Sequence, residues 1–377
     1  MNPNTNLKTY SLKEVPYYKL HGRTDTTQYP LPLFWNGSAI EVNVTGTELW
    51  IDIDVDFDFH EPWVGTSIDG AVMSRQMLMP GSYSVCLFRN MTQEPVKNVR
   101  FFRELQAMSE DNACHVLIRG FQTDGEFSPV ADKPVKLEFI GDSITSGEGT
   151  YGAKGDYPWI TMFMSSSKHY ATMTGEALNA DIRLISQGGW GVLCGWDNDP
   201  RHSIPTRYEA ICGLAEGEFN ESLGAQKPNP FDQWQPDAII VNLGTNDASA
   251  FEQPAFTVPE TGEVFKQRKN EDGSFNAEDV ARFEKAVVDF LYMLRRNNPN
   301  SHIVWTYGML GYNLSLPIAH AVSTYRAETG DNKAYFLQLP NTTEETVGSR
   351  FHPGVKSHER ASKVLIEYLQ ELLQLPQ

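Results

Sequence analysis

Short runs of alternating hydrophobic and polar residues fill the first third of the chain. Residues 39–44 read AIEVNV, and 48–59, 83–88 and 112–121 repeat this alternation or nearly so, with turn-forming residues between them. A period of two places the apolar side chains on one face of a strand, which is typical of antiparallel sheets with one buried face. No amphipathic helix pattern interrupts these runs. The pattern predicts an antiparallel β-sandwich or jelly roll over residues 1–132.

The hydrophobic pattern changes after about residue 135. Four short segments are almost continuously apolar, as strands buried on both faces of a parallel sheet are. Helical stretches lie between some of them and close the chain, and residues 277–297 show a clear helical period. Strands that alternate with helices predict a doubly wound α/β domain over residues 133–377. The four predicted strands are residues 135–140, 181–186, 237–243 and 302–308.

Composition and charge narrow the function classes. The chain has 377 residues, of which 40% are hydrophobic and 21% charged, so it is an ordinary globular protein long enough for two domains. Its formal net charge of −17 repels nucleic acids and anionic membranes, so we expect neither as a partner. A neutral substrate suits this charge better than a phosphorylated one.

The sequence shows no pattern of export or membrane insertion. The segment MNPNTNLKTYSLKEV lacks the apolar core of a signal peptide, and no run of about eighteen apolar residues occurs. The four cysteines are widely spaced without a CxxC pair, so we expect free thiols and a cytoplasmic location. The nine histidines form no HExxH motif, so neither a metal nor another cofactor is expected.

Four polar motifs follow the apolar strands or precede the last helix. They contain a serine, glycines, an asparagine and a histidine, in that order along the chain. Acyl transfer needs such groups, because serine can be acylated, histidine can carry its proton, and N–H groups can stabilise the oxyanion. No GxSxG motif occurs, which excludes the nucleophile turn of α/β-hydrolases. The motifs are GDS (141–143), QGGWG (187–191), GTND (244–247) and SRFHPG (349–354).

These four motifs resemble those of the SGNH (GDSL-like) hydrolase superfamily. The segment HGRTDTTQYPLPLFWNGSAIEVNVTGTELWIDI, followed later by FIGDSIT, is further similar to carbohydrate esterase family 2. The resemblance runs from about residue 18 to the end of the chain. It implies an N-terminal β-sandwich joined to an SGNH domain with a flavodoxin-like doubly wound parallel sheet. It also implies a serine carboxylic-ester hydrolase that removes acetyl groups from xylan, mannan or related oligosaccharides.

The resemblance also implies roles for single residues. Ser143 would be the nucleophile and His352 the base, while Gly189 and Asn246 would complete an oxyanion hole with the N–H of Ser143. The motif QGGWG permits a second register, so Gly188 is the alternative to Gly189. We expect Asp142 to be structural and to hold its loop through local hydrogen bonds.

The sequence departs from the superfamily at the third member of the triad. Many superfamily members carry an aspartate three residues before the histidine, and some family 2 members carry it two residues before, where this chain has Ser349 and Arg350. No carboxylate lies nearby in the sequence unless Glu344 or Glu345 folds back. The resemblance to family 2, which includes Ser–His dyads, implies such a dyad here, in which one or more main-chain carbonyls accept the Nδ1–H of His352.

Aromatic residues in these motifs are candidates for substrate contact, because sugar rings stack on flat aromatic faces. Trp190, Phe351 and Trp196 are the three candidates, and packing in a core is the alternative for each. Trp190 is also expected to restrict the acyl pocket to an acetyl group. His358 is expected to be structural.

Three functions are compatible with these features. The first is a deacetylase acting on plant-polysaccharide oligosaccharides, and the second is an SGNH esterase or thioesterase acting on small acyl or lipid esters. The third is a catalytically weak sugar-binding protein. The sequence leaves the polysaccharide, the hydroxyl position and the oligomeric state open.

Overall fold

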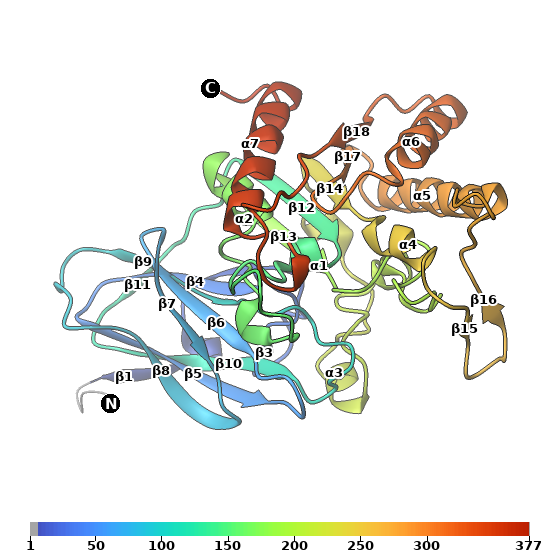
Figure 1. Ribbon diagram of the computed structural model, residues 1–377. Coiled ribbons are helices and arrows are strands. Elements are labelled where there is room, and N and C mark those ends of the chain that lie inside the picture. Colours follow the sequence, from blue (N-terminus) through green and yellow to red (C-terminus); the bar gives the residue numbers. More distant parts are fainter. Residues whose placement is uncertain (1–6, 377) are drawn as a thin grey trace. The chain divides into compact units, whose positions relative to one another are not determined.

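The computed structural model describes residues 7–376 (Figure 1). The chain divides into two compact units. The first comprises the described part of Met1–Lys133 together with Ile160–Met162 and Ala210–Asn229. The second comprises Pro134–Trp159, Phe163–Glu209 and Pro230–Gln377, as far as these are described. The sequence placed the division at 132/133 without the two later segments, and as a domain boundary it stays a prediction.

Two antiparallel sheets form the first unit. One has the strand order β1-β10-β5-β8 with β3 beside β10, and the other has the order β11-β4-β9-β6-β7 with β2 beside β4. The predicted sandwich is therefore confirmed. The strands are β1 (Lys8–Ser11), β2 (Lys19–His21), β3 (Leu31–Pro32), β4 (Ala39–Val44), β5 (Glu48–Asp56), β6 (Trp63–Ile68), β7 (Ala71–Met77), β8 (Gly81–Arg89), β9 (Lys97–Arg103), β10 (His115–Thr123) and β11 (Phe127–Ser128).

The alternating side chains of both sheets meet in one hydrophobic core. Val42 of β4 and Val99 of β9 are buried together with Ile51 of β5 and Phe121 of β10. Burial of the apolar face of each strand is the main stabilisation of such a sandwich. Helix α3 (Glu218–Ser222) lies in the segment Ala210–Asn229 of this unit.

A five-stranded parallel sheet is the centre of the second unit. Its strand order is β13-β12-β14-β17-β18, so the chain starts in the sheet interior and crosses over to both edges. This is a flavodoxin-like doubly wound order, and the predicted fold class is confirmed. The strands are β12 (Val135–Gly141), β13 (Ala180–Ser186), β14 (Ala238–Asn242), β17 (His302–Tyr307) and β18 (Ala334–Gln338).

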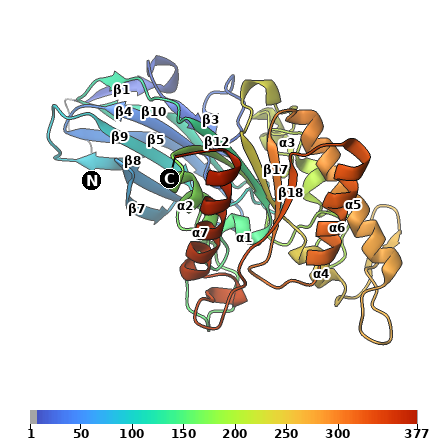
Figure 2. The ribbon, with the colours of Figure 1, turned by 90° about the horizontal axis from the view of Figure 1, so that it is seen from above.

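Helices cover both faces of this sheet. Figures 1 and 2 show α2 and α7 on one face and α5 and α6 on the other. Helix α5 begins at the cap Asn276, whose side chain accepts hydrogen bonds from the N–H groups of Glu278 and Asp279. The helices are α1 (Ser143–Ser146), α2 (Tyr170–Ala177), α4 (Thr245–Ala250), α5 (Ala277–Asn297), α6 (Ser315–Thr329) and α7 (Val355–Leu372), and a small hairpin comprises β15 (Phe256–Thr257) and β16 (Val264–Phe265).

The register of the parallel sheet aligns three strand ends. Gly141, the last residue of β12, pairs with Ser186 of β13 and with Asn242 of β14. The loops that follow these three strands therefore begin at the same level of the carboxyl edge. Ligands bind at this edge in open α/β sheets.

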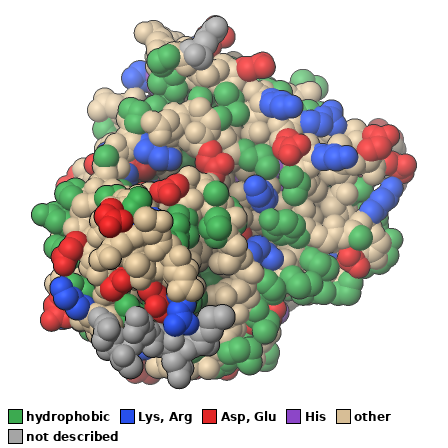
Figure 3. Space-filling view, turned by 90° about the vertical axis from the view of Figure 1, so that its left-hand side faces the viewer, with side chains coloured by type: hydrophobic (Ala, Val, Ile, Leu, Met, Phe, Trp, Pro, Cys, Tyr) green, Lys and Arg blue, Asp and Glu red, His purple; other side chains and the backbone are tan. Residues whose placement is uncertain are grey.

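The surface carries charges of both signs. On the face shown in Figure 3, Lys and Arg side chains are interspersed with Asp and Glu, and the described residues form no continuous basic surface there. None of the helices within residues 7–376 has the length and the hydropathy that crossing a bilayer requires.

Candidate active site

Ser143 lies where the central strand β12 turns abruptly into helix α1. The turn is so tight that a Cβ on Gly141 would lie 2.1 Å from Oγ1 of Thr145. This position therefore needs glycine. Asp142 caps the helix, and its Oδ1 accepts a hydrogen bond of 2.9 Å from the N–H of Ile144. The first helical residue is thereby held at the sheet edge with its side chain directed to the base.

The hydroxyl of Ser143 and the imidazole of His352 are in hydrogen-bond contact. Oγ of Ser143 lies 2.9 Å from Nε2 of His352, although the two residues are 209 positions apart in the sequence. Nδ1 of His352 lies 3.0 Å from the main-chain oxygen of Arg350. A carbonyl accepts only, so Nδ1 carries the hydrogen and Nε2 is left to accept the proton of the serine.

The loop that carries His352 is backbone-strained. It contains the 3-10 helix η5 (Ser349–Phe351), in which φ is 51° at Arg350 and 60° at Phe351. Two consecutive side-chain-bearing residues in the left-handed region are uncommon and need support from their surroundings. The loop ends are joined by a bridge between Val347 and Pro353.

Two N–H groups that were predicted for the oxyanion hole have no acceptor in the described part of the chain. Neither the N–H of Ser143 nor that of Gly189 donates a hydrogen bond within residues 7–376. Gly189 has φ of 81°, and an added Cβ would lie 3.3 Å from Cδ1 of Trp196, so this position favours glycine. The choice between Gly188 and Gly189 as the donor stays a prediction.

Asn246 follows β14 and supplies the third predicted donor. Its Nδ2 donates to the carbonyl of Trp190 over 2.8 Å, which fixes the amide and leaves its second N–H free to donate. The acceptor belongs to the Gly189 loop. The asparagine and the glycine loop therefore hold each other in place.

Asp247 holds the loop after Gly189. The sequence placed it in the GTND motif, but no role was predicted for it. Its carboxylate accepts hydrogen bonds from the N–H groups of Val192, Leu193 and Cys194, at 2.8 to 3.2 Å. Burial raises the pKa of Asp247 to about 6, against the effect of these N–H groups. The D of GTND was the available signal, since it directly follows the predicted oxyanion residue.

Asp142 is fully buried beside the nucleophile. Burial raises the pKa of its carboxyl to about 7, and the negative charges of Asp247 and Glu148 act in the same direction, against the hydrogen bond from Ile144. Its Oδ2 has no hydrogen-bond partner among the described residues. The structure places Asp142 as a cap on α1, in agreement with the structural role expected for it.

The three candidate aromatic side chains differ in exposure. Trp190 is 6% exposed and stacks on the ring of His202 with centroids 4.9 Å apart. Trp196 is 49% exposed, and its main-chain N–H donates to the carbonyl of Gly189 over 3.1 Å. Phe351 is 63% exposed, and its ring lies against the exposed ring of Tyr157, with centroids 5.3 Å apart. Two candidates thus present open aromatic surface.

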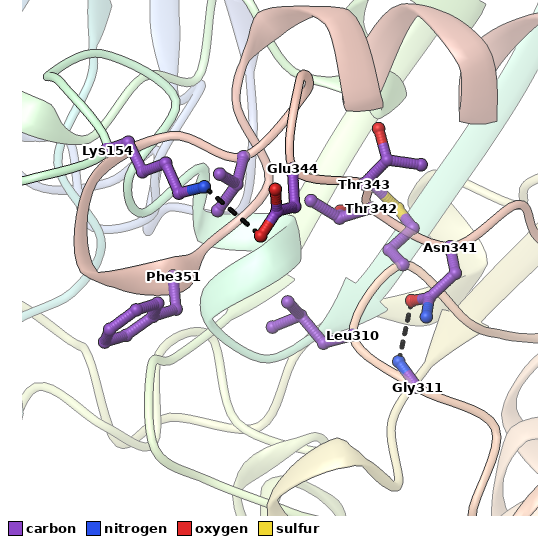
Figure 4. A pocket seen from close by; sticks show the side chains of 10 residues that line it. Lys154, Leu310, Gly311, Asn341, Thr342, Thr343, Glu344 and Phe351 are labelled. Atoms are coloured by element: carbon purple, nitrogen blue, oxygen red, sulfur yellow. Dashed lines mark hydrogen bonds and ion pairs between the residues drawn. The ribbon is translucent and has the colours of Figure 1, made fainter.

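A cavity of about 410 Å³ lies beside the base-bearing loop. Figure 4 shows Phe351 and Leu310 at this cavity, with the ammonium of Lys154 directed to the carboxylate of Glu344 at 3.7 Å. Oδ1 of Asn341 accepts a hydrogen bond from the N–H of Gly311. Lining by an aromatic ring, amide, hydroxyl and charged groups suits a polar ligand with apolar faces.

The structure places a carboxylate near His352 that the sequence did not indicate. Oε1 of Glu148 lies 3.8 Å from Nε2 of His352 and accepts a hydrogen bond of 2.9 Å from Nε of Arg350. Glu344 points to Lys154 instead, and its side chain is almost fully exposed. Among the described residues, no group of three or more His, Cys, Asp or Glu side chains could hold a metal ion.

His358 packs in the interior of the domain. The Nδ1 atom of this residue in α7 accepts a hydrogen bond from the N–H of Tyr170, and its Nε2 lies 3.2 Å from Oγ1 of Thr150. Burial lowers the pKa of this imidazole well below its ordinary value. The side chain is therefore neutral and joins α7 to α2, in agreement with the structural role expected for it.

Comparison with known proteins bears on this geometry. A solved acetyl xylan esterase, Est2A from the rumen bacterium Butyrivibrio proteoclasticus, is 53% identical, with a TM-score of 0.97 over 98% of this chain and 100% of that one. A solved family two carbohydrate esterase from Clostridium thermocellum, in complex with cellohexaose, has a TM-score of 0.78 over 95% of this chain and 100% of that one, at 23% identity. The predicted resemblance to family 2 carbohydrate esterases is confirmed.

A longer relative extends the comparison. Cellulase/esterase CelE from Acetivibrio thermocellus is 27% identical over 338 residues, which are 86% of this chain. The match spans only 36% of that relative's length. The family model described as GDSL-like Lipase/Acylhydrolase matches residues 137–365, which include every motif of the site. The chain belongs to this GDSL-like family of ester hydrolases.

Proposed function

We propose that this protein removes O-acetyl groups from xylan-type or mannan-type oligosaccharides through an acyl-enzyme intermediate. The observation that carries the proposal is the 2.9 Å contact between Oγ of Ser143 and Nε2 of His352 at the carboxyl edge of the sheet. A hydroxyl in contact with a correctly tautomerised imidazole is the requirement for a serine nucleophile. The similarity to Est2A, at 53% identity over nearly the whole chain, supports the choice of an acetylated xylan as substrate.

In the first half of the reaction, Oγ of Ser143 attacks the acetyl carbonyl carbon while Nε2 of His352 takes the hydroxyl proton. The carbonyl oxygen becomes an oxyanion and accepts hydrogen bonds from the N–H of Ser143, the N–H of Gly189 and Nδ2 of Asn246. Each such donor is worth about 3 kcal/mol in the transition state. The bond to the sugar oxygen then breaks, and the imidazolium returns the proton to that oxygen.

In the second half, water attacks the acetyl group bound to Ser143. His352 takes a proton from this water and returns it to Oγ of the serine as acetic acid leaves and then ionises to acetate in solution. The carbonyl of Arg350 holds the same tautomer throughout, because it accepts the Nδ1–H in both halves of the cycle. No further group is required for the balance of protons.

Exposed aromatic rings support a carbohydrate as the alcohol part of the ester. Trp196 lies next to Gly189, and Phe351 directly precedes the base and lines the cavity of Figure 4. The proton returns from Nε2 of His352 to the sugar oxygen, so the sugar must occupy the side of the site that this histidine faces. The cavity beside Phe351 and the ring of Trp196 are the surfaces proposed to bind it.

Release of acetate from acetylated xylo-oligosaccharides and manno-oligosaccharides tests the proposal. The wild type should release acetate from at least one set, and Ser143→Ala should lose about three orders of magnitude of turnover. A variant that keeps a tenth of the wild-type rate would contradict the assignment of the nucleophile. Equal or better rates on octanoyl esters than on acetyl esters would favour a lipid esterase instead.

A cytoplasmic location remains part of the proposal. The four cysteine thiols are free, which agrees with a reducing compartment. Fractionation of the producing cells would test it, with activity outside the cells as the contrary result.

A further inference from the structure

We infer that Glu148 and Arg350 together are a positioning pair for His352, and that they replace the single triad aspartate of other serine hydrolases. The inference rests on the proposed function only in that Ser143 and His352 act as nucleophile and base. Four contacts carry it: Glu148 to Arg350, Arg350 to two backbone carbonyls, and the carbonyl of Arg350 to the imidazole.

The carbonyl that orients the imidazole belongs to a strained residue. Arg350 has φ of 51° and is followed by Phe351 with φ of 60°. Without restraint, an arginine relaxes to negative φ, which rotates its carbonyl away from Nδ1 of His352. The 3.0 Å contact between this carbonyl and Nδ1 therefore depends on whatever keeps Arg350 in the left-handed region.

The side chain and N–H of Arg350 supply that restraint. Nε donates to Oε1 of Glu148 over 2.9 Å, and Nη1 donates to the carbonyl of Tyr157 over 3.1 Å. The N–H of Arg350 donates to the carbonyl of Asp156 over 2.8 Å. All three acceptors lie on the loop that follows the nucleophile, so the two loops are joined through this one residue.

Glu148 is itself fixed to the nucleophile. Its N–H donates to the carbonyl of Ser143 over 2.9 Å, and its side chain is 8% exposed. Glu148 is thus held by the backbone of Ser143, and its carboxylate in turn holds the side chain of Arg350. The carbonyl of Arg350 then orients the imidazole of His352. Removing one partner of a buried ion pair destabilises a protein strongly, because the remaining charge is left buried without a partner.

The two tasks of a triad aspartate are divided here. An aspartate accepts the Nδ1–H and also places a negative charge beside the imidazolium that forms during catalysis. In this protein the carbonyl of Arg350 accepts the Nδ1–H. The nearby charge of Glu148, with Oε1 at 3.8 Å from Nε2 of His352, is balanced by the guanidinium. Because the pair carries no net charge, it contributes mainly by positioning His352 and not by stabilising the imidazolium.

Kinetics of Glu148→Ala, Arg350→Ala and the double variant on 4-nitrophenyl acetate test the inference. Each single variant should lower kcat by about 10- to 100-fold with KM within about threefold, because a misplaced base costs rate and not ground-state binding. The double variant should be no slower than the slower single variant, since both changes break one tether. Glu148→Gln, which keeps a hydrogen-bond acceptor for Arg350, should restore most of kcat.

Three further measurements separate positioning from folding. Arg350→Gly removes the tether and the strain together, so it should melt no lower than Arg350→Ala and still lose kcat. Arg296→Ala breaks another Arg–Glu pair, to Glu209, and should keep the wild-type kcat. The Nδ1 proton of His352 should give a low-field NMR signal in the wild type that is lost in Glu148→Ala.

Single variants within twofold of the wild-type kcat would overturn the inference. So would losses that multiply in the double variant, or an unchanged Nδ1 proton signal. The signal and the 4-nitrophenyl acetate rates do not depend on the natural substrate. A failure to release acetate from oligosaccharides would therefore contradict the proposed function, while the kinetics and the Nδ1 signal of the Glu148 and Arg350 variants would still test the positioning pair.

Discussion

The main-chain oxygen of Arg350 lies 3.0 Å from Nδ1 of His352, at the position where a triad carboxylate would lie. A carbonyl fixes the tautomer as well as a carboxylate does, because both only accept hydrogen bonds. It carries no full charge, so it stabilises the imidazolium less. The chemistry of the site therefore depends on how firmly this one peptide is held.

His352→Ala should be nearly inactive on 4-nitrophenyl acetate, because His352 is the one hydrogen-bond partner of Oγ of Ser143 among the described residues and the group that can take its proton. Glu344→Gln and Glu345→Gln are the matched controls and should each cost less than about tenfold in kcat. Glu344 faces Lys154 at the surface, in agreement with this expectation. Loss of activity in either glutamate variant to the level of His352→Ala would show a relocated triad.

Asn246→Ala should lower kcat by roughly 100- to 1,000-fold with little change in KM, since its hydrogen bond to the oxyanion matters mainly in the transition state. Asn246→Asp is a near-isosteric control that removes the donor and keeps the volume, so it should be similarly slow. Steady-state kinetics on acetyl esters measure both. An effect confined to KM would contradict a role in the oxyanion hole.

Asp142→Asn should stabilise the protein more at alkaline than at acidic pH. The pKa of an aspartate in the unfolded chain is about 4, whereas burial raises the pKa of Asp142 to about 7 in the folded protein. Between these values the folded state holds a proton that the unfolded state has lost. Wild-type stability therefore falls as pH rises through this window, and the loss persists above pH 7.

Melting temperatures at pH 5 and pH 8.5 measure this effect. The asparagine variant should gain several degrees over the wild type at the higher pH and little at the lower one. Asp289→Asn is a control for loss of one negative charge, because this residue pairs with Lys285 on the exposed face of α5. The same difference between variant and wild type at both pH values would refute the assigned ionisation.

Trp196→Ala should raise KM for acetylated oligosaccharides at least about fivefold and change kinetics on 4-nitrophenyl acetate little, since stacking acts on the sugar. Phe351→Ala should show the same pattern of KM changes if both rings contact the same oligosaccharide. Trp234→Ala is a control, because this tryptophan packs against Arg183 of the edge strand β13. Equal losses on both substrates would assign Trp196 to the structure of the Gly189 loop instead.

Strong sequence patterns predicted most of the fold. Residues 39–44 and 277–297 were predicted with the bounds that β4 and α5 have. Strand β18 was not predicted, because its run of consecutive apolar residues, AYFL, is only four long. The strand lies at the sheet edge and is only partly buried. Helix α6 was missed as well, since its apolar residues form no distinct stripe along SLPIAHAVSTYRAET.

Local motifs predicted the residues of the site but not what holds them. Ser143 and His352 follow from short motifs, and the structure places them in contact. Glu148 is five residues after the serine in a glycine-rich loop, and its partner Arg350 is 202 positions away. Only the folded chain joins these two residues, and a search for an acid close to the histidine in sequence could not find it.

The segment Ala210–Asn229 has a consequence for the modularity of the protein. In the sequence it falls between strands β13 and β14 of the parallel sheet, yet it belongs to the compact unit of the β-sandwich. There, Nε1 of Trp35 donates to the carbonyl of Ile211 over 2.8 Å. Truncation at residue 133 would therefore strip this segment of its buried indole partner. We therefore expect that residues 134–377 do not fold independently, and that gene fusions with this protein must retain both halves.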